Sequence, residues 1–184
     1  MRYTIRDMRY TILGIDPGLA DTGYGIIEKD NKGKLICREY GVVKTSAKKD
    51  VEERLETINK NLNKIIKKYK PKLIAVEELF FCKNVKTALL VGQARGVILL
   101  TARQNKIPTV EFTPLQVKQA VSSYGQAGKI QVQKMVKILL GLKELPKPDD
   151  AADALAIAIC AANSGPKQNE MVSKLICKVS LNNI

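Results

Sequence analysis

Histidine is absent from this 184-residue sequence, and cysteine is sparse. Without histidine the chain can form neither a Ser–His or Cys–His nucleophile pair nor a zinc site with imidazole ligands. The four cysteines are far apart and form no C-x-x-C pair, which argues against a zinc site and against a disulfide framework. They are Cys37, Cys82, Cys160 and Cys177. Acid–base or metal chemistry must therefore use Asp, Glu, Lys, Tyr or Cys.

Long apolar segments are also missing. No run approaches the roughly 18 residues that a membrane span needs. The N-terminus is polar and its apolar run is short, which is unlike a secretory signal. We therefore expect no membrane association, a cytoplasmic location and reduced thiols. The length suits one domain of ordinary size.

Acidic residues are in deficit. Lys and Arg number 31 against 18 Asp and Glu, which gives a formal net charge of +13. A small protein of this charge usually meets a polyanion, and nucleic acid is the commonest one. The alternative is a lysine-rich solvated surface, since net charge bears on association and not on fold.

The N-terminus contains a repeat, because residues 1–5 and residues 8–12 both read MRYTI. A strand duplicated in place has no evident packing purpose. We therefore expect Met8 to be the native start and residues 1–7 to be an upstream extension. Residues 165–184 are polar and weakly patterned, which predicts a flexible C-terminal tail. The domain itself is expected to span 8–164.

Hydrophobic periodicity predicts three strands, then alternating helices and strands. The strands are expected at 10–15, 22–29, 34–43, 73–76 and 107–112, and the helices at 50–69, 85–104, from 113 onward, 129–140 and 149–163. This order predicts an α/β fold with a mixed five-stranded sheet flanked by helices, an antiparallel meander followed by parallel strands. It is similar to the ribonuclease H-like architecture.

The last predicted helix contains a carboxylate in apolar surroundings. In residues 151–162 every residue except Asp153 is apolar, so the helix should be buried, where an ionised carboxylate needs a counter-ion or a metal. Asp150 lies one turn earlier on the same face. A buried pair with Lys or Arg is the alternative for Asp153. Asp149 is expected to stabilise the first helical turn.

Two predicted strands also end on acids. Asp16 follows the first apolar strand and precedes Pro-Gly, where a simple Asx turn is the alternative. The strand at 73–76 runs into Glu77 and Glu78. Because neighbouring strand residues face opposite sides of a sheet, only one of these two can join a given cluster.

These acids could converge at one edge of the sheet. Carboxylates without histidine favour hard cations, so we expect Mg²⁺, with Mn²⁺ as a substitute. On a basic protein, such a cluster suggests phosphodiester hydrolysis with two ions per site.

Several motifs, in order from about residue 9 to 162, resemble the RuvC family of crossover (Holliday) junction endodeoxyribonucleases. They are Gly14-Ile15-Asp16-Pro17-Gly18, Thr22-Gly23-Tyr24-Gly25, Val76-Glu77-Glu78-Leu79-Phe80, Lys83-Asn84, Gly92-Gln93-Ala94-Arg95-Gly96-Val97, Gln116-Val117-Lys118-Gln119, Lys129-Ile130-Gln131-Val132-Gln133 and Asp150-Ala151-Ala152-Asp153-Ala154-Leu155-Ala156.

The resemblance implies a set of four catalytic, metal-binding acids: Asp16, Glu77, Asp150 and Asp153. It selects Glu77 over Glu78. It also implies that Phe80 stacks on a base at the junction centre, with core packing as the alternative and Phe81 as the other candidate for that packing. It places Lys118 and Lys129 near the scissile phosphate, where ordinary surface charge is the alternative.

The resemblance further implies a homodimer that nicks two opposed strands of a four-way junction symmetrically, in DNA recombination and DNA repair. It implies RuvA and RuvB, the branch-migration proteins, as partners. The motif at 125–129 is too short for a P-loop, and 184 residues cannot hold the two lobes of an actin-like ATPase. A non-catalytic nucleic-acid-binding module and a nuclease acting on RNA or RNA–DNA hybrids remain as alternatives.

Overall fold

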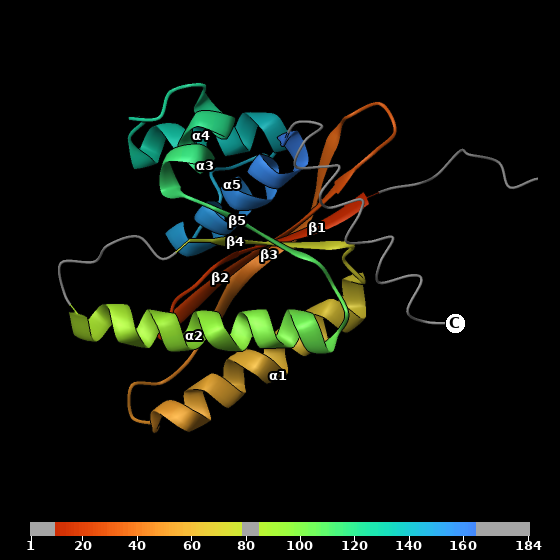
Figure 1. Cartoon of the computed structure of the whole chain (residues 1–184). Helices are drawn as coiled ribbons and strands as arrows, with labels where there is room; N and C mark the ends of the chain where they lie inside the picture. Colours follow the sequence, from red (N-terminus) through yellow and green to blue (C-terminus); the bar gives the residue numbers. More distant parts are fainter. Residues whose placement is uncertain (1–9, 79–84, 165–184) are drawn as a thin grey trace, which may run out of the picture.

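The computed structural model describes residues 10–78 and 85–164. Within these ranges the chain forms strands and helices in the predicted order (Figure 1). The strands are β1 (Tyr10–Asp16), β2 (Asp21–Lys29), β3 (Leu35–Lys44), β4 (Leu73–Glu77) and β5 (Thr109–Phe112). The helices are α1 (Val51–Tyr69), α2 (Val85–Gln104), α3 (Pro114–Ser122), α4 (Lys129–Leu140) and α5 (Asp149–Asn163).

The sheet is mixed, and its strand order is β3-β2-β1-β4-β5. β1 pairs antiparallel with β2 and β2 with β3, while β4 lies parallel to β1 and β5 parallel to β4. The predicted meander followed by parallel strands is thus confirmed. β1 lies at the centre, so the residue that ends it is flanked by strands on both sides.

Local sequence explains where the elements begin and end. In the β2–β3 turn, the Asp30 carboxylate accepts hydrogen bonds from the backbone N–H groups of Lys32 and Lys34, and Gly33 takes a positive φ of 83°. Before α3, Thr113 and Gln116 form a reciprocal capping box, with proline in the first turn. β5 begins at Thr109, two residues later than predicted, after Pro108.

Two hydrophobic cores lie on opposite faces of the sheet. α1 and α2 cover one face, and α3, α4 and α5 cover the other (Figure 1). In α5, 11 of the 15 residues are buried, as expected for a helix that is apolar on nearly every side.

Among the described residues, no helix is both long and apolar enough to cross a bilayer. The expected extension at residues 1–7 and the expected tail at 165–184 lie outside the described residues.

Candidate active site

Two acids end adjacent parallel strands at the same edge of the sheet. Asp16 is the last residue of β1 and Glu77 the last of β4, and the residues that precede them, Ile15 and Val76, are partners across the ladder. Ala75, two residues before Glu77, packs into the core beneath α5, so strand alternation directs Glu77 toward that helix. Glu78 is exposed. The prediction that only one of the pair joins the cluster is consistent with this arrangement.

α5 brings the other two acids to the same place because it packs directly on backbone. Gly23 is the partner of Asp16 across the β1–β2 ladder, and a Cβ at Gly23 would overlap the carbonyl oxygen of Asp150. A Cβ at Gly14 would likewise overlap the carbonyl oxygen of Ala154. Two glycines without side chains therefore let the first half of α5 contact the strands, and they fix its acids beside Asp16.

The charges of these acids interact. Burial raises the pKa of Asp16 to about 8, with further contributions from Glu77, Asp153 and Asp150, whereas Lys129 acts in the opposite direction. Burial and then Asp153 raise the pKa of Glu77 to about 6. Burial also raises the pKa of Asp153, against the charge of Lys129. The four predicted acids thus form one electrostatic cluster, called here the acid cluster, that carries more negative charge than its surroundings compensate.

Both predicted lysines lie at this cluster. A pocket of about 200 Å³ is lined by Glu77, Asp153, Lys118 and Lys129 together with apolar residues of α3, α4 and α5. Lys118 lowers the pKa of Glu77 electrostatically. The Lys129 ammonium lies 3.4 Å from Asp153 Oδ2. The alternative for Asp153, a pair with Lys or Arg, is therefore present as an ion pair with Lys129, in addition to the acid cluster.

Asp149 has a different environment from the one predicted. It lies in the first turn of α5, but the N-cap residue is Pro148 and no side-chain capping bond forms. Its carboxylate instead accepts a hydrogen bond from Gln133 Nε2 at 2.8 Å and lies 3.2 Å from Lys129 Nζ. These two contacts hold the pKa of Asp149 below its usual range. Asp149 therefore joins α5 to α4, and only its helix-dipole role follows the prediction.

The acid cluster suits a hard divalent cation. Its ligands are all carboxylate oxygens, and a cation would offset the repulsion that raises the pKa of Asp16. Within the described ranges no group of three or more His, Cys, Asp or Glu side chains is close enough together to hold a metal ion in common. Mg²⁺ usually binds through only one or two carboxylates together with substrate phosphates and retained waters.

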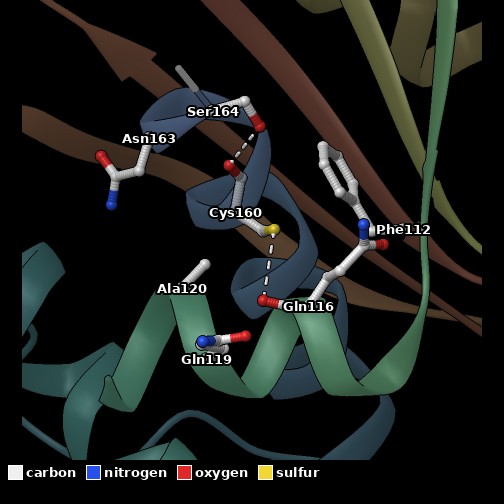
Figure 2. Close-up of a pocket in the computed structure, with 7 residues that line it drawn as sticks. All are labelled: Phe112, Gln116, Gln119, Ala120, Cys160, Asn163 and Ser164. Atoms are coloured by element: carbon white, nitrogen blue, oxygen red, sulfur yellow. Dashed lines mark hydrogen bonds between the residues drawn. The ribbon is translucent and has the colours of Figure 1, made fainter. Parts of the chain in front are cut away.

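A larger pocket, of about 370 Å³, lies between α3 and α5 beside β5 and contains none of the predicted site residues. Figure 2 shows Cys160 Sγ donating to the backbone oxygen of Gln116, and Ser164 Oγ donating to that of Cys160. Burial raises the pKa of Cys160 to about 12, so this thiol is neutral and unsuited to nucleophilic chemistry. The larger cavity therefore does not identify the active site.

The structure also shows two residues that support the candidate site and that the motifs did not identify as site residues. Gly23 supports α5 and Gln133 holds Asp149, although both lie inside quoted motifs. Their roles depend on which elements touch, so a sequence alone carries little trace of them. Phe80 and its alternative Phe81 lie outside the described residues.

Comparison with known proteins gives a consistent result. The family model for crossover junction endodeoxyribonuclease RuvC matches residues 12–161. A curated relative of that name from Halothermothrix orenii is 58% identical over 154 residues, covering 83% of this chain and 92% of the relative. Another, from Caldicellulosiruptor saccharolyticus, is 55% identical over 149 residues, covering 81% and 90%.

Among solved structures, Thermus thermophilus RuvC in complex with a Holliday junction substrate matches with a TM-score of 0.80 and 38% identity. The match covers 83% of this chain and 93% of that one.

Proposed function

The chain belongs to the RuvC family of crossover junction endodeoxyribonucleases, and on this basis we propose that it resolves Holliday junctions in homologous recombination and DNA repair. It would nick two opposed DNA strands symmetrically by hydrolysis of a phosphodiester bond. The observation that carries the proposal is the acid cluster at the end of β1 and β4, beside a pocket lined by two lysines. The mixed sheet with helices on both faces is the ribonuclease H-like fold of this family.

The family is metal-dependent, and we assign the metal-binding role to Asp16, Glu77, Asp150 and Asp153. Two Mg²⁺ ions, with Mn²⁺ as a substitute, would supply positive charge at the scissile phosphate and at the oxygens of the attacking and leaving groups. The carboxylates must be deprotonated to hold these ions. Because the pKa of Asp16 is about 8 without metal, binding of the ions and loss of its proton are coupled.

We assign Lys118 and Lys129 to the DNA backbone. Both line the pocket beside the acid cluster, where an ammonium group can face a phosphate without displacing the carboxylates. For Phe80, stacking on a base at the junction centre stays a prediction from family resemblance, and the expected gain is about 1–3 kcal/mol.

We propose that the protein acts as a homodimer, since two opposed nicks need two active sites. α2 supports this, because Leu89 and Leu100 are exposed on a helix face that also carries the exposed Gln93 and Gly96. Nothing lies within 4 Å of where a Cβ at Gly96 would project, so a second helix could approach closely. RuvA and RuvB remain proposed partners, and a DNA substrate accords with the expected cytoplasmic location.

A cleavage assay tests the function directly. Purified protein is incubated with a labelled synthetic four-way junction, with a linear duplex of the same sequence and with an RNA–DNA hybrid, each with Mg²⁺ or with EDTA. We expect paired symmetrical nicks in the junction alone, abolished by EDTA. The variant D16N should bind the junction without cutting it.

The remaining outcomes would contradict the proposal in different ways. Tight junction binding without cutting under any divalent metal would indicate a binding module. Preferential cutting of the duplex or hybrid would keep the metal chemistry but change the substrate. Loss of junction binding in D16N, together with unfolding, would make Asp16 a structural residue.

A further inference from the structure

Four polar side chains in contact with one another connect the N-terminal ends of α4 and α5. Lys129 and Gln133 are one turn apart on α4, and Asp149 and Asp153 are one turn apart on α5, so each pair lies on one face of its helix. Lys129 Nζ lies 3.2 Å from Asp149 Oδ2 and 3.4 Å from Asp153 Oδ2. Gln133 Nε2 donates to the other carboxylate oxygen of Asp149 at 2.8 Å. One ammonium is therefore shared between two acids with different roles.

Only Asp153 of these two acids belongs to the acid cluster. The charge of Asp153 acts on both Asp16 and Glu77, whereas Asp149 is exposed and acts on Asp153. A divalent cation held by Asp153 and the lysine ammonium would compete for the same carboxylate. Without a second anion nearby, the Lys129 ammonium would either repel the divalent cation or move into solvent. Asp149 provides that second anion, and the bond from Gln133 fixes its orientation.

We propose that Asp149, oriented by Gln133, is a positioning residue that keeps the Lys129 ammonium at the rim of the site while Asp153 binds a divalent cation. Asp149 would touch neither metal nor DNA. Besides the direct effect of its charge on Asp153, its main effect would pass through Lys129, which would remain beside the position that a DNA phosphate takes. The inference rests on the proposed function for cation binding by Asp153 and for the role of that lysine, whereas the ion pairs of Lys129 with both acids are present in the free protein.

A double-mutant cycle on the full-length protein tests the inference, with D149N, K129M and the double variant. Mn²⁺ binding without DNA is measured by electron paramagnetic resonance, and single-turnover nicking is measured on a pre-bound four-way junction. E52Q is the matched control, because Glu52 is an exposed first-turn acid on α1, on the opposite face of the sheet. Junction affinity in EDTA and thermal stability are recorded for every variant.

The expected signs are specific. K129M should bind Mn²⁺ more tightly, because a competing cation is gone. D149N should bind Mn²⁺ more weakly and nick more slowly, each by roughly three- to fivefold as for an exposed ion pair, with unchanged junction affinity. In the K129M background, D149N should weaken Mn²⁺ binding clearly less than it does with Lys129 present, since Asp149 then has no ammonium to hold and only its direct charge effect on Asp153 is lost. E52Q should change neither measurement.

Two results would overturn the inference. An equal loss of Mn²⁺ affinity from D149N in both backgrounds would show that Asp149 acts directly on the cation as a charge or ligand. No effect of D149N in either background would show that the contact with Lys129 is incidental. If the Mn²⁺ cycle behaves as expected but the unsubstituted protein nicks no junction, the proposed function fails while the positioning role stands.

Discussion

Carboxylates on the two faces of the sheet have opposite environments. On the face covered by α1 and α2, Glu39 accepts hydrogen bonds from Tyr24, at 3.0 Å, and from Tyr69, and it pairs with Lys68. The bond from Lys68 and then the bond from Tyr69 hold the pKa of Glu39 below its usual range. On the face covered by α5, burial and neighbouring acids raise the pKa of Asp16 to about 8.

The difference separates an acid that stabilises the fold from acids that prepare a site. Glu39 joins β3 to the end of α1, and every partner that it contacts favours its ionised form. Asp16 and Glu77 are buried and close to other acids, which disfavours their ionised forms and which a bound cation would offset. Uncompensated charge at the end of a strand is therefore a better indicator of function here than the presence of an acid as such.

The largest effect on the nicking rate is expected for substitution of Glu77, whereas substitution of its neighbour Glu78 should have little effect. E77Q should slow nicking of a four-way junction on the order of 100-fold or more, a loss typical of removing one group that stabilises charge in a transition state. E78Q, in which an exposed acid is changed, should remain within about threefold of the unsubstituted protein. Single-turnover rates at saturating Mg²⁺ measure both. Similar losses in the two variants would mean that strand alternation does not select the ligand.

Substitution of Glu39, whose partners compensate its charge, should destabilise the fold. E39Q keeps the side-chain shape but weakens its bonds to Lys68, Tyr24 and Tyr69, and it should lower the free energy of unfolding by about 1–2 kcal/mol. Y69F should cause a smaller loss by removing one donor. Urea unfolding measures the stability of both variants, and junction nicking by the folded fraction should be unchanged. A stable E39Q variant would show that the partners of Glu39 contribute little.

Substitution of Asp16, whose charge its neighbours do not compensate, should stabilise the fold. In EDTA at pH 7.5, D16N should raise the free energy of unfolding by about 1 kcal/mol or more, because it removes a carboxyl group whose ionised form is disfavoured first by burial and then by three neighbouring acids. Saturating Mg²⁺ should stabilise the unsubstituted protein and have much less effect on D16N. Thermal unfolding with and without Mg²⁺ measures both effects. Destabilisation by D16N in EDTA would contradict the electrostatic account of the cluster.

The smallest effect concerns the pH dependence of stability without metal. Asp16 and Glu77 have raised pKa values in the folded state, so their contribution to stability falls as pH rises from their ordinary range toward about 6 for Glu77 and about 8 for Asp16. Glu39 has a lowered pKa, so its contribution is present above its ordinary pKa and is lost as the solution becomes more acidic.

Comparison of D16N and E39Q with the unsubstituted protein from pH 3 to 9 should resolve these opposite slopes. D16N should flatten the decline in stability between pH 4 and 8, and E39Q should flatten the loss at lower pH. An unchanged slope in D16N would mean that Asp16 is ionised well below pH 8.

Much of the fold was predictable because its local determinants are strong. The bounds of α4 and α5 agree with the predicted helices, and the capping box at Thr113 begins α3 where Thr-Pro indicated. The start of β5 was displaced because an apolar run does not show which of its residues find a partner strand. The pairing of β1 with β4 also depends on tertiary contacts, so alternation of strands and helices could only suggest it.

The residue types of the candidate site were predictable from the sequence, but the contacts that balance their charges were not. Asp16, Glu77 and Asp153 are unusual in their own sequence contexts, each as an acid beside apolar residues. The contacts of Asp149 with Gln133 and Lys129 join two helices and follow no local rule, so the first-turn position of Asp149 was interpreted as a helix-dipole and capping contribution. Residue types thus indicate candidate ligands more readily than the groups that orient them.

The packing of α5 on Gly14 and Gly23 has a consequence for how the enzyme can vary. The atoms of α5 nearest to these glycines are backbone carbonyl oxygens, so the separation between Asp16 and the acids of α5 is set mainly by main-chain contact. A side chain at Gly23 or Gly14 would meet a carbonyl oxygen of α5 at 2.0 or 2.2 Å, so a substitution at either glycine would have to move the helix and with it the acids that it carries.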